Sequence, residues 1–341
     1  MFRAVISSVW FKTAVGLLLG GVAFMVVSQG LDLTQILDET QQIRWGWVIV
    51  GVLVIFVTVL VKAWRWRMLF YPEGRDISWR SLTHAVVLGQ FFNFMLPAAR
   101  LGDVARIFSL DHSVNKAQVV GTLVLEKTLD MIMVVLTIFV ILPFVALPEG
   151  ISNPIVLSTT AVVASIILYL LAYQTRFVIS IVEFCAQILP GRLRDVVMRL
   201  AVAGLEGLAA LRNVQVVFNL LLVSVLITIL SVLTPFVLFY AFDFPLGLAE
   251  AAALNIALLV GSLPSPVVGN IGVFEFITIR TLEQFGLSGS STLLAFALLF
   301  HLVVFLPIIL WGMLVIARSD WRGWFVWMRS GHERSDVSKS R

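Results

Sequence analysis

The sequence is poor in cysteine and in charged residues. Of its 341 residues only Cys185 is a cysteine, so an internal disulfide is impossible and no His/Cys cluster can hold zinc. Charged residues make up 13% of the chain and hydrophobic residues 60%, whereas a soluble domain has about a quarter charged residues. With a mean hydropathy of +1.00, these shortages exclude a water-soluble enzyme, a disordered chain and a disulfide scaffold.

Common catalytic motifs are also missing. The sequence contains no G-x-S-x-G elbow, no H-E-x-x-H and no P-loop. We therefore expect no enzymatic activity, no cofactor and no metal. The 24 Lys and Arg against 20 Asp and Glu are scattered, which argues against nucleic-acid binding and favours basic loops that face anionic lipid.

Long apolar runs dominate what is present. A membrane helix needs about 20 largely apolar residues. The stretches of suitable length that lack Asp, Glu, Lys and Arg are 13–31, 45–61, 81–99, 131–148, 150–175, 213–242, 251–274 and 284–317.

The charges that flank two of these runs suggest that they do not cross. Basic segments, 62–80 and 100–116, lie on both sides of run 81–99, whereas acidic residues dominate both sides of run 251–274. Since Lys and Arg prefer the cytoplasm, we expect the first run to be a re-entrant hairpin from inside and the second a hairpin from outside. Six crossings then remain. Eight full crossings are the alternative, but they would place five arginines of segment 174–212 outside.

The expected fold class is all-α: a polytopic membrane helical bundle with about six crossings, two re-entrant hairpins and an inverted-topology repeat. Residues 1–317 form the integral membrane domain, with repeat halves of about 1–148 and 150–317. Residues 318–341 form a cytoplasmic juxtamembrane segment and polar tail, so both termini are expected inside. A cleaved signal peptide is the alternative interpretation of run 13–31.

A repeated sequence motif supports the division of the chain into two repeat halves. Segments 96–103 (LPAARLGD) and 263–270 (LPSPVVGN) share the pattern L-P-x-x-x-x-G-[D/N], and each follows an asparagine, Asn93 or Asn255. Proline ends a helix, glycine permits a reversal and Asp or Asn can cap the next helix. Inverted-repeat transporters place such broken helices at the substrate site, where helix N-termini favour anions. The alternative is a chance match between two apolar segments.

Charged side chains cluster after the first motif. Arg100 and Arg106 could hold a lipid phosphate by bidentate hydrogen bonds, or Arg100 could simply extend to the membrane surface. Glu126 and Asp130 share one face of a helix expected to begin near Gln118. We expect this acidic pair to contact Arg100, Arg106 or Lys127, either as part of a binding site or as a purely structural bridge.

In the second half, Glu275 has three open roles: a proton carrier, a partner of Arg280 or an outer-surface charge. A lone intramembrane histidine such as His301 is more often hydrogen-bonded to a neighbour than part of a proton relay. The residues predicted to contact substrate share a position in or beside the two motifs. They are Asn93, Pro97, Arg100, Gly102, Asp103, Arg106, Glu126, Lys127, Asp130, Pro264, Ser265, Gly269, Asn270, Gly272 and Glu275.

Three ordered motifs, in segments 93–106, 126–130 and 263–275, resemble the lysylphosphatidylglycerol synthase transmembrane-region family, also called flippase-like membrane proteins. The resemblance implies an inner-membrane protein related to the lipid-flipping half of the bifunctional aminoacyl-phosphatidylglycerol synthases. It does not imply lysyl transfer, because that activity belongs to a C-terminal synthase domain for which the sequence leaves no room. By the same likeness, the family's polar positions correspond to Arg100, Asp103, Arg106, Glu126, Asp130 and Glu275. His301 departs from a position that is often basic in relatives.

The leading hypothesis is a flippase or transporter of the plasma (inner) membrane for an anionic, phosphate-bearing lipid, either a phospholipid or a polyprenyl-phosphate-linked one. The alternative is a non-transporting partner that presents lipid to a glycosyltransferase or synthase, and a third is an intramembrane transferase. The expected partners are membrane lipids with anionic head groups and a lipid-modifying enzyme, with no nucleic acid. The oligomeric state stays open.

Overall fold

The computed structural model describes residues 42–71, 76–95, 101–110, 114–145, 213–262 and 267–318, together with isolated positions between 159 and 198. These residues form helices and their connections, and the described ranges contain no strand. The all-α prediction is thereby confirmed. The runs 13–31 and 150–175, the motif residues Pro97, Arg100, Pro264 and Ser265, and the tail lie outside the described residues.

Three helices in the described part of the chain are long and apolar enough to cross a membrane. They are α3 (Trp45–Leu69), α11 (Val214–Ala241) and α14 (Ser290–Arg318). Each corresponds to a charge-free run of the sequence. Their outward faces expose large apolar side chains such as Ile49, Ile229 and Leu310, a surface suited to lipid rather than to water.

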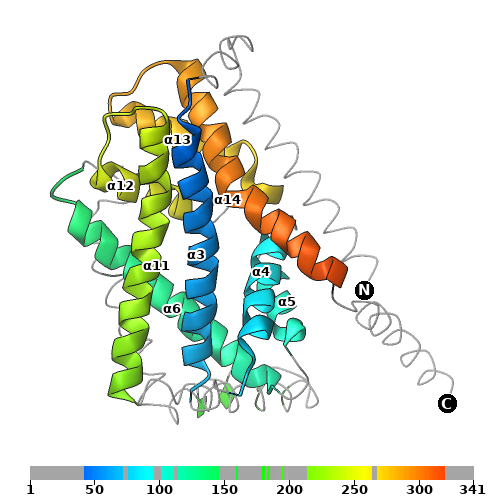
Figure 1. Cartoon of the computed structure of the whole chain (residues 1–341). Helices are drawn as coiled ribbons and strands as arrows, with labels where there is room; N and C mark the ends of the chain where they lie inside the picture. The colour runs from blue at the N-terminus through cyan, green and yellow to red at the C-terminus, as the bar shows by residue number, and fades with distance from the viewer. Residues whose placement is uncertain are drawn as a thin grey trace.

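Helices α3 and α11 lie side by side along the length of the bundle (Figure 1). Gly51 of α3 lies where the three long helices meet, since a β-carbon there would be in ordinary van der Waals contact with both neighbours, 3.5 Å from Leu238 of α11 and 3.4 Å from Val303 of α14. The three long helices therefore share a packed centre. The remaining helices are placed around it.

Helix α6 (Lys116–Ile141) crosses the bundle obliquely in Figure 1 and carries charge within it. Asn115 caps its first turn by accepting a hydrogen bond from the backbone N–H of Ala117 at 3.0 Å. The helix begins two residues before Gln118, close to the expected start. Glu126 and Asp130 consequently lie well inside a helix whose other residues are largely apolar.

Helices α4 (Trp79–Met95) and α5 (Leu101–Ser109) pack against each other and form what we call the first hairpin. Two glycines allow this contact. A β-carbon on Gly102 would overlap the backbone carbonyl oxygen of Gly89, and one on Gly89 would lie 2.6 Å from the Arg106 side chain. The motif glycine is therefore required by close helix packing, and its conformation is helical rather than left-handed.

Helices α12 (Leu248–Ser262) and α13 (Val273–Gln284), with the short 3-10 turn η3 (Val268–Asn270), form the second hairpin. Here positive φ angles at Gly269, Asn270 and Gly272 reverse the chain before α13. The sequence run 251–274 thus contains one arm and the reversal, and the returning arm extends ten residues further, to Gln284.

The two hairpins occupy opposite ends of the bundle in Figure 1, with α4 and α5 low and α12 and α13 high. Their inner ends meet. Helix α4 packs against η3, the β position of Gly269 lies 3.8 Å from the carbonyl oxygen of Phe94, and the ring of Phe94 lies 4.2 Å from that of Phe305 in α14. Residues far apart in the sequence thereby converge near the middle of α14.

Candidate functional site

A buried, bidentate charge pair joins α5 to α6. Arg106 donates two hydrogen bonds to the carboxylate of Glu126, at 2.8 and 2.7 Å, and both residues are buried. The guanidinium also lies 4.1 Å from the centre of the Trp66 ring. A bidentate geometry and a cation–π contact together hold the arginine firmly. The expectation that Glu126 pairs with a cation of the first hairpin is confirmed.

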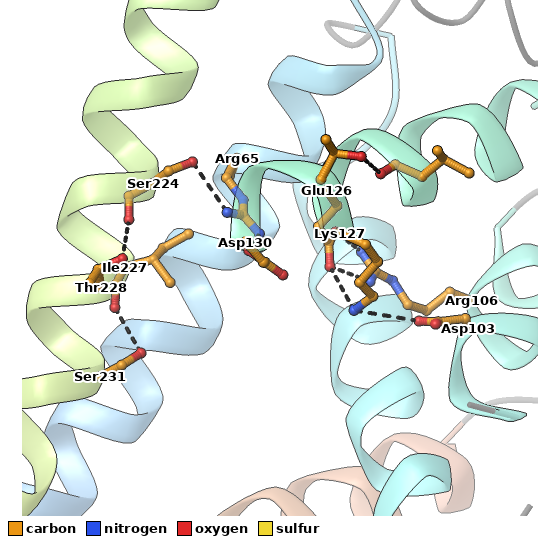
Figure 2. A network of polar contacts seen from close by, with 12 residues as sticks. Arg65, Asp103, Arg106, Glu126, Lys127, Asp130, Ser224, Ile227, Thr228 and Ser231 are labelled. Atoms are coloured by element: carbon orange, nitrogen blue, oxygen red, sulfur yellow. Dashed lines mark hydrogen bonds and ion pairs between the residues drawn. The ribbon is translucent and has the colours of Figure 1, made fainter. Parts of the chain in front are cut away.

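Lys127 and Asp103 extend this cluster more loosely. The Lys127 ammonium lies 3.6 Å from a carboxylate oxygen of Glu126 and 4.0 Å from one of Asp103 (Figure 2). Both side chains are partly exposed. The cluster therefore balances two cations with two anions and leaves no strong net charge.

Asp130 does not join this cluster. Its carboxylate accepts a hydrogen bond at 2.7 Å from Arg65 of α3, and Arg65 also donates to the Ser224 hydroxyl of α11 at 3.2 Å (Figure 2). Two of its three expected partners, Arg106 and Lys127, form no ion pair with Asp130, because Asp130 lies one helical turn beyond Glu126 and faces α3. The third, Arg100, lies outside the described residues. Arg65 is almost fully buried, so this contact links three helices within the bundle.

Asn93 has a structural role at the inner end of the first hairpin. Its side-chain oxygen accepts a hydrogen bond from the backbone N–H of Gly102 at 2.9 Å. Helix α5 begins at Leu101, so this bond satisfies one of the free N–H groups of its first turn. The corresponding Asn255 makes no such bond among the described residues and instead lines a cavity.

Glu275 forms the main polar contact of the second hairpin. One carboxylate oxygen lies 2.6 Å from Nδ1 of His301 in α14, and the other accepts a hydrogen bond at 2.6 Å from the backbone N–H of Gly272. Glu275 is only 2% exposed, and Arg280 pairs with Glu283 instead. Two of the three roles left open for Glu275, a partner of Arg280 and an outer-surface charge, are therefore wrong. His301 is hydrogen-bonded to a neighbour, as expected.

A cavity of about 310 Å³ lies between helices α3, α4, α6, α11, α12 and α14. It is bordered by side chains of both hairpins and of the Arg65–Asp130 contact. Its charged and amide-bearing lining residues are Lys62, Arg65, Gln90, Asp130 and Asn255, and its hydroxyl-bearing ones are Thr58, Thr137, Ser224, Thr228, Ser231 and Thr234.

Lys62 is the cation in this cavity that has no fixed partner. Within the described ranges, no hydrogen bond or ion pair to its ammonium occurs, whereas Arg65 is held by Asp130 and Ser224. In the sequence, Lys62 and Arg65 fall within segment 62–80, whose charge pattern marks it only as a basic flank. Their spacing of three residues, which puts both on one helix face, was the signal available for finding them.

Residues 10–312 match the model of the family described as the lysylphosphatidylglycerol synthase TM region. The chain belongs to this family. The match covers most of the chain, confirms the resemblance found in the three motifs and, with the long apolar helices, makes the chain a membrane protein. No curated protein matches the chain.

The family match includes both hairpins and every wall of the cavity, so all the polar contacts above belong to the shared region. The described part of the predicted substrate set does not form one site. Asn93 and Gly102 bond to each other at the inner end of the first hairpin. Arg106, Glu126, Lys127 and Asp103 form one cluster on the first hairpin and α6, while Gly269, Asn270, Gly272 and Glu275 surround the start of α13. Asp130 and the missed Lys62 face the cavity between them.

Proposed function

We propose that the chain moves an anionic, phosphate-bearing lipid, a phospholipid or a polyprenyl-phosphate-linked lipid, between the leaflets of the plasma membrane. The cavity carries this proposal. It lies inside an apolar bundle, and its described lining residues include two cations and one carboxylate. One of those cations, Lys62, has no hydrogen bond or ion pair within the described ranges. A lipid phosphate would be neutralised there while its acyl chains stay among the apolar outer faces.

In this proposal the two hairpins are re-entrant and related by an inverted repeat, with both termini in the cytoplasm. Their positions at opposite ends of the bundle and the contact of their inner ends at Phe94 and Gly269 support it. Alternating access would then require the hairpins to open in turn toward the two leaflets. The proposal includes no catalytic step.

The test is lipid translocation in proteoliposomes. Purified protein is reconstituted with a trace of acyl-chain-labelled anionic phospholipid, and the fraction of label reduced by external dithionite is followed over time. Protein-containing vesicles are expected to expose more than half of the label, whereas empty vesicles expose the outer half only. Absence of transport for phospholipids and for a polyprenyl phosphate alike would remove the proposal.

A matched pair of lysine variants sharpens this test. Lys62→Gln removes the free cation of the cavity and is expected to slow transport about tenfold, since a charged hydrogen bond contributes about 1.5–3 kcal/mol. Lys116→Gln makes the same change at the first residue of α6, where the ammonium contacts Phe108 outside the cavity, and is expected to leave transport unchanged. Lipid that binds at Lys62 but is not translocated would support a partner that presents lipid to another enzyme.

A further inference from the structure

Five of the six hydroxyl groups on the cavity wall share one hydrogen-bonding arrangement, and the sixth, Ser224, accepts a hydrogen bond from Arg65. Each of the five donates its hydrogen to the carbonyl oxygen four residues earlier in its own helix, and Figure 2 shows two of them on α11. The donors and their distances are Thr58 at 2.7 Å, Thr137 at 2.6 Å, Thr228 at 3.0 Å, Ser231 at 2.8 Å and Thr234 at 3.2 Å.

This arrangement decides what the wall can bind. A hydroxyl has a single hydrogen and two lone pairs, so a hydroxyl that donates to its own helix offers only acceptor sites to a ligand. Phosphate oxygens are acceptors as well and would gain nothing from this wall. A ligand group with O–H or N–H donors would be bound there.

The basic end of the cavity has the opposite preference. Lys62 offers N–H donors with no acceptor bonded to them in the described part of the chain, and Arg65 lies three residues further along the same helix. Phosphate therefore fits at Lys62 and a donor-bearing group fits along α11. A ligand that satisfies both ends carries a phosphate and, beyond it, several donors.

The charges in the cavity favour a neutral hydroxyl over an ammonium as the ligand's donor group. The one carboxylate that lines the cavity in the described part of the chain is Asp130, whose Oδ1 accepts a hydrogen bond from Arg65 at 2.7 Å. An ammonium group would thus face two cations and a single carboxylate that already pairs with one of them. A neutral hydroxyl has no such penalty, and it can also bond to the amides of Gln90 and Asn255, which both donate and accept.

Building on the function proposed above, we propose that the cavity selects a lipid whose head group joins a phosphate to a neutral polyhydroxylated group, such as a sugar or cyclic polyol. The phosphate lies at Lys62. The hydroxyls donate to Thr228 and Ser231 of α11. Lipids that end in a bare phosphate lack the donors, and lipids that end in an ammonium carry the wrong charge.

The experiment compares three lipids with identical labelled acyl chains: phosphatidylinositol, phosphatidic acid and phosphatidylethanolamine. In proteoliposomes of the full chain, phosphatidylinositol is expected to move at least about fivefold faster than either of the others, the factor that one net hydrogen bond of about 1 kcal/mol provides. Equal rates for phosphatidylinositol and phosphatidic acid, or a faster rate for phosphatidylethanolamine, would overturn the selectivity and leave lipid transport standing.

A pair of variants locates the selectivity. Thr228→Val with Ser231→Ala removes two acceptors and is expected to slow phosphatidylinositol about fivefold or more while phosphatidic acid is unaffected. Thr128→Val is the control, because Thr128 donates to Val124 in the same way but lies outside the cavity lining. A double variant that slows both lipids equally, or neither, would contradict the assignment.

If no lipid is transported, a measurement of lipid binding still tests the head-group selectivity. Native mass spectrometry of detergent-solubilised protein with the same three lipids is expected to show preferential retention of phosphatidylinositol, lost in the Thr228→Val/Ser231→Ala variant and kept in Thr128→Val. Preferential binding without transport would refute the proposed function alone. Equal retention of all three lipids would refute the selectivity.

Discussion

The two hairpins are attached to the bundle by different chemistry. The first is held to α6 by Arg106 and Glu126, which carry full charges and share two hydrogen bonds. The second is held to α14 by Glu275 and His301, of which the histidine is charged only when protonated. Both attachments are buried. Two hairpins with similar sequence motifs thus use different pairs for attachment. We expect the charged bidentate pair to be the stronger attachment, and removal of one partner from each pair tests this expectation.

The largest effect is expected for Arg106→Leu. This change leaves the Glu126 carboxylate buried without its bidentate partner, which costs about 3–5 kcal/mol in the free energy of unfolding. Equilibrium unfolding in mixed micelles measures it. The double variant Arg106→Leu/Glu126→Leu should recover most of the loss, because a buried pair replaced by apolar residues is close to neutral. A single variant as stable as the wild type would contradict the attachment of the first hairpin.

A smaller loss is expected at the second hairpin. Glu275→Gln weakens the contact with His301 and the bond from Gly272, and should lower the free energy of unfolding by about 1.5–3 kcal/mol. Glu283→Gln is the matched control on the same helix, because its pair with Arg280 is exposed and contributes less than about 1 kcal/mol. The comparison between hairpins fails if Glu275→Gln costs more than Arg106→Leu.

Helix packing within each hairpin provides a third comparison. Gly102→Ala places a methyl group against the backbone carbonyl oxygen of Gly89, which cannot move aside, and should cost about 1–3 kcal/mol. Gly261→Ala in the second hairpin meets the flexible end of Ile277, so we expect a loss below about 1 kcal/mol. Thermal unfolding midpoints of both variants in the same detergent would show the order, and a reversed order would refute the close approach of α4 and α5.

The smallest effect is expected for Lys127→Gln. Its ammonium lies 3.6 Å or more from both carboxylates and is 37% exposed. Such pairs contribute about 0–1 kcal/mol. A loss as large as that of Arg106→Leu would mean that the cluster acts as one unit and that Arg106 and Glu126 are not its main pair.

The sequence alone was sufficient for features that depend on local pattern. The charge-free runs predict α3, α11 and α14, and runs 81–99 and 251–274 contain most of α4 and most of α12, one arm of each hairpin. The i,i+4 spacing of Glu126 and Asp130 predicts that both lie on one face of α6. That the hairpins are re-entrant stays a prediction. The Arg106–Glu126 pair could be predicted from the sequence because it joins consecutive helices.

Contacts between helices that are distant in the sequence could not be predicted in this way. Arg65 of α3 meets Asp130 of α6 across 65 positions. No local pattern indicates which distant helices pack together, so the sequence favours the nearer cations as partners of Asp130. The contact between Glu275 and His301 joins consecutive helices, α13 and α14, but Arg280 is the nearer cation to Glu275 in the sequence. Lys62 was counted as a loop charge, although α3 continues through it to Leu69.

If the cavity between Lys62 and α11 holds a lipid head group, that group should be visible in a cryo-electron microscopy map of the full chain in nanodiscs that contain phosphatidylinositol. We expect phosphate density within hydrogen-bonding distance of Lys62 Nζ, with the head group extending along Thr228 and Ser231. A map in which lipid head groups lie only at the rims of the bundle, and the cavity holds none, would contradict this expectation.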